Sequence, residues 1–180
     1  KRQLLTYGEI NTWDVSQITD MSNLFDGKQG FNSDISSWDV SSVINMSNMF
    51  RQASDFEGDL SSWDVSNVIN MAGMFNEATN FNGDLSSWNV SSVTQMNQMF
   101  LRATNFNSEL SEWNVSNVIG MSSMFQFTNF NQDISSWDVS NVTSIGRMFQ
   151  QNPSFNQDIS SWDVSNVTNM IATFLSLIHI

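Results

Sequence analysis

The sequence predicts a repeat solenoid, in which a short unit of chain is wound once and stacked seven times. Tryptophan recurs every 25 residues with one interval of 24, at Trp13, Trp38, Trp63, Trp88, Trp113, Trp137 and Trp162. A valine follows two positions after each tryptophan, and a serine follows that valine in all seven units. Periods of this length are typical of stacked repeats. One residue is missing between Phe125 and Phe130, where we expect Phe127 to displace the usual Ala-Thr step.

The apolar residues of each unit follow two different spacings. In the second unit, Trp38 and Val40 are two residues apart, which places both side chains on one face of a short strand. The apolar residues of 46–53 then follow the i, i+3, i+4, i+7 spacing of a short helical turn. We therefore expect one short strand and one short helical turn in each 25-residue unit.

A single unit cannot fold alone. Its eight apolar side chains contribute about 12–24 kcal/mol of burial, at roughly 1.5–3 kcal/mol each. Ordering its backbone costs about 1–2 kcal/mol per residue, which is more in total. Stacking buries both sides of each unit and adds a parallel strand ladder, so the seven units are predicted to form one continuous core.

The recurring motif W-D-V-S-N-V-T-x-M-x-x-M-F resembles a leucine-rich-repeat variant found in the BspA-like surface proteins of bacteria. The resemblance covers residues 6–174. It implies a curved, leucine-rich-repeat-like solenoid, with the strand ladder on the concave side and the helical turns on the convex side. It also implies an extracellular, cell-surface setting and a role in adhesion or partner binding. The family offers no catalytic motif to transfer.

Both ends of the chain depart from the pattern. Residues 1–5 are interpreted as the remnant of an N-terminal cap, and residues 6–174 as the seven-unit solenoid. Residues 175–180, which include His179, leave the repeat, and a read-through artefact is one explanation for this tail. Our hypothesis is that the chain is an internal fragment of a longer surface protein.

Composition excludes several classes of function. The net charge of −12 and only six scattered Lys and Arg residues argue against binding to nucleic acid. The sequence has no cysteine and one histidine, so zinc sites and Ser-His or Cys-His catalysis are not expected. No apolar run is long enough to insert this segment into a membrane. We expect a protein that is not an enzyme.

Carboxylates are the remaining candidates for a chemical role, and they form two rows along the stack. One row holds Asp34, Asp59, Asp84, Glu109, Asp133 and Asp158, and the other holds Asp14, Asp39, Asp64, Asn89, Asn114, Asp138 and Asp163. The simpler interpretation of the first row is solvated turns, in which each carboxylate accepts hydrogen bonds from turn amides. A calcium ladder is the alternative, although no calcium-loop signature accompanies the rows. We expect no other cofactor. For the tryptophans, a buried ladder is predicted in preference to an exposed platform for stacking sugars.

If tryptophan and valine point inward, the residues between and beside them point outward. This outward face is the predicted binding surface: Ser37, Asp39, Ser41, Ser62, Asp64, Ser66, Ser87, Asn89, Ser91, Glu112, Asn114, Ser116, Ser136, Asp138, Ser140, Ser161, Asp163 and Ser165. The expected partner is a protein or glycan of another cell or of the matrix. The alternatives are a ligand array for calcium, glycans or ice, and a purely structural stalk.

Overall fold

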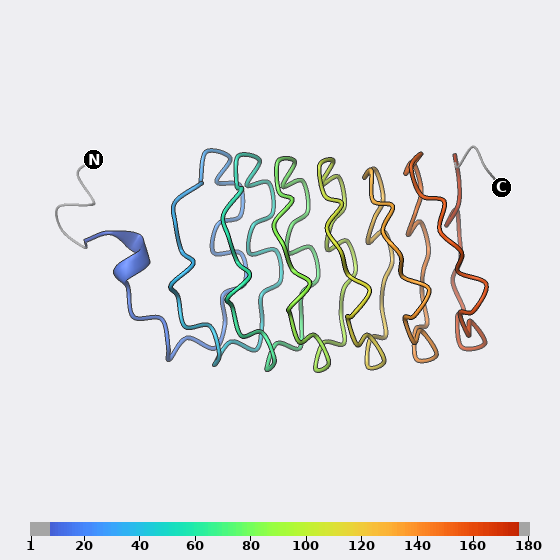
Figure 1. The fold of residues 1–180 in the computed structure, drawn as a ribbon, viewed down its shortest axis with the longest axis horizontal. Coiled ribbons are helices and arrows are strands. Elements are labelled where there is room, and N and C mark those ends of the chain that lie inside the picture. The colour runs from blue at the N-terminus through green and yellow to red at the C-terminus, as the bar shows by residue number, and fades with distance from the viewer. Residues whose placement is uncertain (1–7, 177–180) are drawn as a thin grey trace.

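The computed structural model describes residues 8–176, which wind through successive coils stacked side by side from one end of the molecule to the other (Figure 1). Equivalent residues of neighbouring units form parallel bridges, from Asp20–Asn45 and Asn45–Asn70 through to Ser144–Asn169. These bridges join residues 24 or 25 positions apart. The tandem repeat of about 25 residues is therefore confirmed.

The chain within each unit is mostly irregular. The one regular element in the described part of the chain is the short 3-10 helix η1 (Ile10–Thr12), and the bridges between units are isolated ones. No strand and no α-helix occurs within residues 8–176. The prediction of a short strand and a helical turn per unit, with a strand ladder, is therefore wrong, and each half of the unit shows why.

The tryptophan half of the unit is folded by two tight turns. The amide of Trp38 donates to the carbonyl of Ile35 at 3.1 Å, and the amide of Val43 donates to the carbonyl of Val40 at 2.9 Å. Turns this close together leave no extended run that could form a ladder. The predicted alternation still holds for side chains, since Trp38 and Val40 are both buried while Asp39 between them is exposed.

Side chains also capture the amides that a ladder would need. Asp34 accepts from the amide of Ser36 at 2.9 Å, and Asp39 accepts from the amide of Ser41 at 3.1 Å. Short polar side chains compete in this way with secondary structure for the backbone. An amide bonded to its own turn cannot pair with the next unit.

The methionine-phenylalanine half, residues 45–53 in the second unit, follows consecutive turns. Asn48 and Gln52 have left-handed backbone angles, with φ of 55° and 58°, which an α-helix does not contain. As a result alternate amides point along the stack, and those of Met46, Asn48, Phe50 and Gln52 donate to carbonyls of the next unit at 2.7–2.9 Å. A helix would satisfy these amides internally and leave no bonds between units.

The core runs through the middle of the stack. Phe50, Phe75, Phe100 and Phe125 stack with ring centroids 5.5–5.7 Å apart and planes within 3° of parallel. Trp38 and every later tryptophan are buried, and each indole N–H donates to a carbonyl of the preceding unit at 2.9–3.2 Å. The predicted buried tryptophan ladder is confirmed from the second unit onward, whereas Trp13 is 45% exposed.

The shortened fifth unit differs from the sequence-based expectation. Phe127 takes the left-handed position that Arg102 holds in the preceding unit, with φ of 58° and 59°. Thr128 is buried in the place of Ala103, and its hydroxyl donates to the carbonyl of Phe125 at 2.8 Å. This bond replaces the one made by the amide of Ala103. The expectation that Phe127 displaces the Ala-Thr step is therefore wrong.

The structure describes only part of the segments that the sequence assigned to a cap remnant and a tail. Residues 1–5 and residues 177–180, with His179, lie outside the described residues. Leu175 and Ser176 still follow the geometry of the repeat. The carbonyl of Leu175 accepts the amide of Gln151 at 3.0 Å, and Ser176 has a left-handed φ of 76°.

Candidate functional site

The outward face predicted from the sequence consists of three rows of residues, one residue per unit in each row, and the rows differ in exposure. The first row is exposed at Ser37, Ser62, Ser87, Glu112, Ser136 and Ser161. The second row is exposed at Asp39, Asp64, Asn89, Asn114, Asp138 and Asp163. The third row is half-buried at Ser41, Ser66, Ser91, Ser116 and Ser140, and becomes exposed only at Ser165. The first two rows are therefore the most exposed part of this face.

The middle and third rows interact with each other. The Asp39 carboxylate accepts from the amide of Ser41 at 3.1 Å and from its hydroxyl at 2.6 Å. Asn89 accepts the same two bonds from Ser91, at 3.2 and 2.7 Å. The serine of the third row thus holds the turn and orients the acidic residue.

The serines of the first row join neighbouring units. The hydroxyl of Ser62 donates to the carbonyl of Ser36 at 3.0 Å, and that of Ser87 donates to the carbonyl of Ser61 at 2.9 Å. Ser136 and Ser161 make the equivalent bonds at 2.8 Å. The hydroxyl protons of these serines are committed to the stack, so a partner would meet the oxygens as acceptors.

The other carboxylate row caps turns, as the simpler interpretation predicted. Each aspartate accepts from the amide of the serine two positions later, at 2.8–2.9 Å, in the pairs Asp34–Ser36, Asp59–Ser61, Asp84–Ser86, Asp133–Ser135 and Asp158–Ser160. One carboxylate oxygen in each pair makes this bond. We call this row, together with the row from Asp14 to Asp163, the acidic face.

Hydrogen bonding favours the ionised form of the aspartates in the acidic face. The hydroxyl and the amide of Ser41 lower the pKa of Asp39, and the neighbouring carboxylates Asp14 and Asp64 offset part of this by repulsion. The amide and the hydroxyl of Ser61 likewise lower the pKa of Asp59. The aspartates of both rows are therefore charged at neutral pH.

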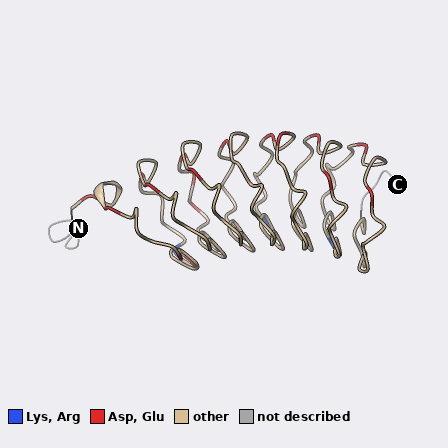
Figure 2. Cartoon of the chain, turned by 90° about the horizontal axis from the view of Figure 1, so that it is seen from below, with Lys and Arg blue, Asp and Glu red and all other residues tan. Residues whose placement is uncertain are grey.

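Charge is distributed unevenly around the coils. Figure 2 shows acidic residues along the upper edge of the stack and basic residues in the loops at the lower edge. The two ion pairs among the described residues, Arg51–Asp26 at 2.8 Å and Arg102–Glu77 at 4.0 Å, both lie in the methionine-phenylalanine half. Neither pair includes a carboxylate of the acidic face, so that face has no cation of its own within the described chain.

Comparison with known families places the chain. Residues 2–110 and 84–179 match, in two overlapping copies, the family described as Mycoplasma protein of unknown function, DUF285. The chain belongs to this family. No curated protein matches it, and no solved structure does. Its function must therefore be argued from its own surfaces.

The described part of this DUF285 chain contains neither a cluster of metal ligands nor a membrane-spanning helix. Within residues 8–176, no group of three or more His, Cys, Asp or Glu side chains is placed to hold a metal ion. The carboxylates of the acidic face are spread at most one per unit in each row, and the aspartates among them accept hydrogen bonds within turns. The described part of the chain also contains no helix that is long and apolar enough to cross a membrane.

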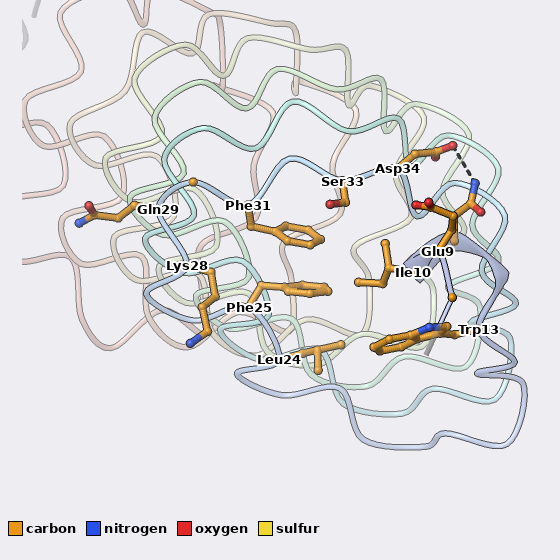
Figure 3. Close-up of a pocket in the computed structure, with 13 residues that line it drawn as sticks. Glu9, Ile10, Trp13, Leu24, Phe25, Lys28, Gln29, Phe31, Ser33 and Asp34 are labelled. Atoms are coloured by element: carbon orange, nitrogen blue, oxygen red, sulfur yellow. Dashed lines mark hydrogen bonds between the residues drawn. The ribbon is translucent and has the colours of Figure 1, made fainter. Parts of the chain in front are cut away.

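A hollow of about 920 Å³ lies at the first unit. Phe25, Phe31 and Ile10 project into it (Figure 3), and Phe25 stacks on Phe31 with centroids 3.8 Å apart. At its edge the Asn11 amide donates to Asp34 at 3.0 Å. The hollow is the end of the aromatic core, and we assign it no ligand.

A second groove was not predicted from the sequence. It has a volume of about 470 Å³ and crosses five units, lined by Gln29, Gln52, Ser54, Glu77, Thr79, Arg102, Thr104 and Phe127. The sequence does mark this region by variation within the repeat, because one position of the repeat holds Gln52, Glu77, Arg102 and Phe127 in successive units. That variation pointed to no surface until the backbone geometry was known.

Proposed function

We propose that this DUF285 chain is a non-enzymatic recognition module that binds a partner protein through its acidic face. The partner would present a surface rich in lysine and arginine. Two rows of ionised carboxylates without cations among the described residues would attract such a surface and orient it. The single observation that carries the proposal is that the acidic face holds more charge than its own folding needs.

Asparagine in the middle units provides the evidence for surplus charge. Asn89 accepts both hydrogen bonds that Asp39 accepts, at nearly the same distances. The turn can therefore form without a carboxylate. Aspartate is nevertheless present in the other units, although neighbouring carboxylates such as Asp14 and Asp64 repel Asp39. A charge that the turn does not need, and that repels its neighbours, is available for binding a partner.

The setting proposed for this function is the cell surface. It is supported by the resemblance of the repeat to BspA-like leucine-rich repeats, which implies an extracellular role in adhesion. The stacking of every unit on the next also suits a rigid display of the acidic face. A structural stalk is the competing interpretation, and the binding experiment distinguishes the two.

The test is to change charge without changing the turn. A variant with Asp39, Asp64, Asp138 and Asp163 all replaced by Asn should stay folded, with at most a small fall in the thermal unfolding midpoint at neutral pH, since Asn89 already makes the same bonds. Its binding to nona-lysine and nona-arginine peptides should weaken about tenfold or more. Isothermal titration calorimetry measures the affinity at low and high salt.

The matched variant adds charge to the same row. Asn89→Asp with Asn114→Asp completes the aspartate row and should strengthen binding of the same peptides. Binding should fall with salt for every variant, because the attraction is electrostatic. Equal affinity of all three proteins would contradict the proposal, and failure to bind any basic peptide or protein would favour the stalk.

A further inference from the structure

The groove that crosses five units is lined by side chains that vary from unit to unit. Three of the five units contribute two residues each to the groove. One of the two is at the left-handed turn position, and the other lies two residues later in the chain. Its left-handed positions are occupied by Gln52, Glu77, Arg102 and Phe127, four different chemical groups in succession. The phenylalanines two residues earlier, Phe50 to Phe125, are identical in the same four units.

These side chains are held where glycine would be less strained. The φ angles at Gln52, Glu77, Arg102 and Phe127 are 58–60°. Residues with a Cβ rarely adopt this conformation, and bulky ones least of all. The first unit does use glycine here, with Gly27 at φ of 70°.

The backbone of the groove does not require these side chains. The amides of Gln52, Glu77, Arg102 and Phe127 all donate to carbonyls of the next unit, at 2.7–3.0 Å. Gly27 makes the same bond at 2.8 Å without any side chain. What the larger residues add is therefore the chemistry that they present to the groove.

That chemistry is an aromatic ring beside planar polar groups. The guanidinium of Arg102 lies 5.1 Å from the centroid of the Phe127 ring, which is 36% exposed. The guanidinium of Arg102 also lies 4.0 Å from the carboxylate of Glu77, and the side-chain amide of Gln52 donates to the same carboxylate at 3.2 Å. Gln29, Ser54, Thr79 and Thr104 complete the lining, and the hydroxyls of Thr79 and Thr104 donate to carbonyls of the preceding unit at 3.4 Å. Charge within the groove is balanced.

We propose that this groove binds a neutral oligosaccharide. The ring of Phe127 would contact the apolar face of one sugar, and Glu77, Arg102 and Gln52 would bond its hydroxyls. A peptide added as a strand is disfavoured because the groove amides are already bonded within the stack. A polyanion is disfavoured because one carboxylate balances the one guanidinium. The site is separate from the acidic face and does not depend on it.

The experiment uses the full chain with four named probes: maltohexaose, cellohexaose, chitohexaose and β-1,4-mannohexaose. Saturation-transfer NMR detects binding and calorimetry measures its affinity. At least one probe should bind, and Phe127→Gly or Arg102→Gly should weaken it about tenfold or more. Both variants should fold. The thermal midpoint of Arg102→Gly should be no lower than that of the parent, and the midpoint of Phe127→Gly should be near that of the parent.

Gln151→Gly is the matched control. Gln151 has the same left-handed geometry, with φ of 57°, but does not line the groove. It should change the unfolding midpoint as the other glycine variants do and leave sugar binding intact. Failure of all four probes to bind, or binding that survives Phe127→Gly, would overturn the proposal. Preferential binding of dextran sulfate would do so as well, because it would show a polyanion site.

Discussion

The two halves of each unit are joined to their neighbours by different chemical groups. In the tryptophan half, side chains do much of this work, as when the hydroxyl of Ser62 donates to the carbonyl of Ser36 and that of Ser87 donates to the carbonyl of Ser61. In the methionine-phenylalanine half, the backbone does it, through alternate amides that donate to the next unit. Both halves share one aromatic core.

This difference explains where the sequence repeats faithfully and where it varies. Serine and aspartate recur in the tryptophan half because their side chains make the bonds that fix its turns. In the other half the bonds come from the main chain, so an outer residue such as Gln52, Arg102 or Phe127 can change without loss of the stack. The varied surface is therefore found where the backbone carries the structure.

The largest expected effect comes from the core that both halves share. Trp88→Ala should lower the free energy of unfolding by about 3–5 kcal/mol, because it empties a buried site and leaves the carbonyl of Leu60 without its indole donor. Urea denaturation measures the change. Trp13→Ala should cost less, since Trp13 is 45% exposed. Ser87→Ala removes one exposed hydrogen bond and should cost less than about 1.5 kcal/mol. Equal costs at Trp88 and Ser87 would contradict the assignment of inward and outward positions.

The second-largest effect should come from acid, which should destabilise mainly the tryptophan half of each unit. Hydrogen bonds from the following serines lower the pKa values of Asp39, Asp59 and Asp84 in the folded chain. Their stabilisation is therefore complete above the unfolded value of about 3.9 and is lost as pH falls through the lower folded values. Urea midpoints should be flat from pH 7 to about pH 5 and fall below about pH 4.

The variant with four Asp→Asn changes, described above, is the control for this acid effect. Its asparagines do not titrate, so its stability should fall less steeply below about pH 4 than that of the parent. A steeper fall in the variant would show that repulsion along the row outweighs the serine bonds. The sign of the pKa shifts would then be wrong.

The smallest effect tests the backbone of the other half. Gln98 is exposed with a φ of 59°, and Gly73 holds the same position in the preceding unit. Gln98→Gly should raise the free energy of unfolding by about 0.5–1 kcal/mol, since relief of the left-handed strain exceeds the added freedom of the unfolded chain. Gln95→Gly, at a position without a positive φ, should lower it instead. A loss of stability at both positions would contradict the left-handed assignment.

The error about secondary structure has a specific origin. The spacing of Met46, Met49 and Phe50 fits one face of a helix, yet it fits consecutive turns equally well. The residues that break the helix in this unit, Asn48 and Gln52, are not glycines, and glycine holds their left-handed positions only at Gly73 and Gly27 in other units. A signal did exist in the tryptophan half, where the Asp-x-Ser spacing of Asp34 and Ser36 is typical of side-chain-capped turns.

The candidate surfaces were predictable to different degrees. Alternation around Trp38 was enough to place Asp39 outward, and the structure agrees. It could not show that Ser41 is half-buried against its own turn, because that depends on the fold of three consecutive residues. The groove at Arg102 and Phe127 was not foreseen, since it joins residues from five units.

The sequence by itself determined the period, the number of units and the inward-facing aromatic and aliphatic residues, because each unit faces the same problem of burying apolar surface. Only the tertiary structure decided the path of the backbone. Amide direction depends on whether a neighbouring unit offers carbonyls, as the next unit does for Asn48 and Gln52. That choice is made by the stack and cannot be read from one unit's local pattern.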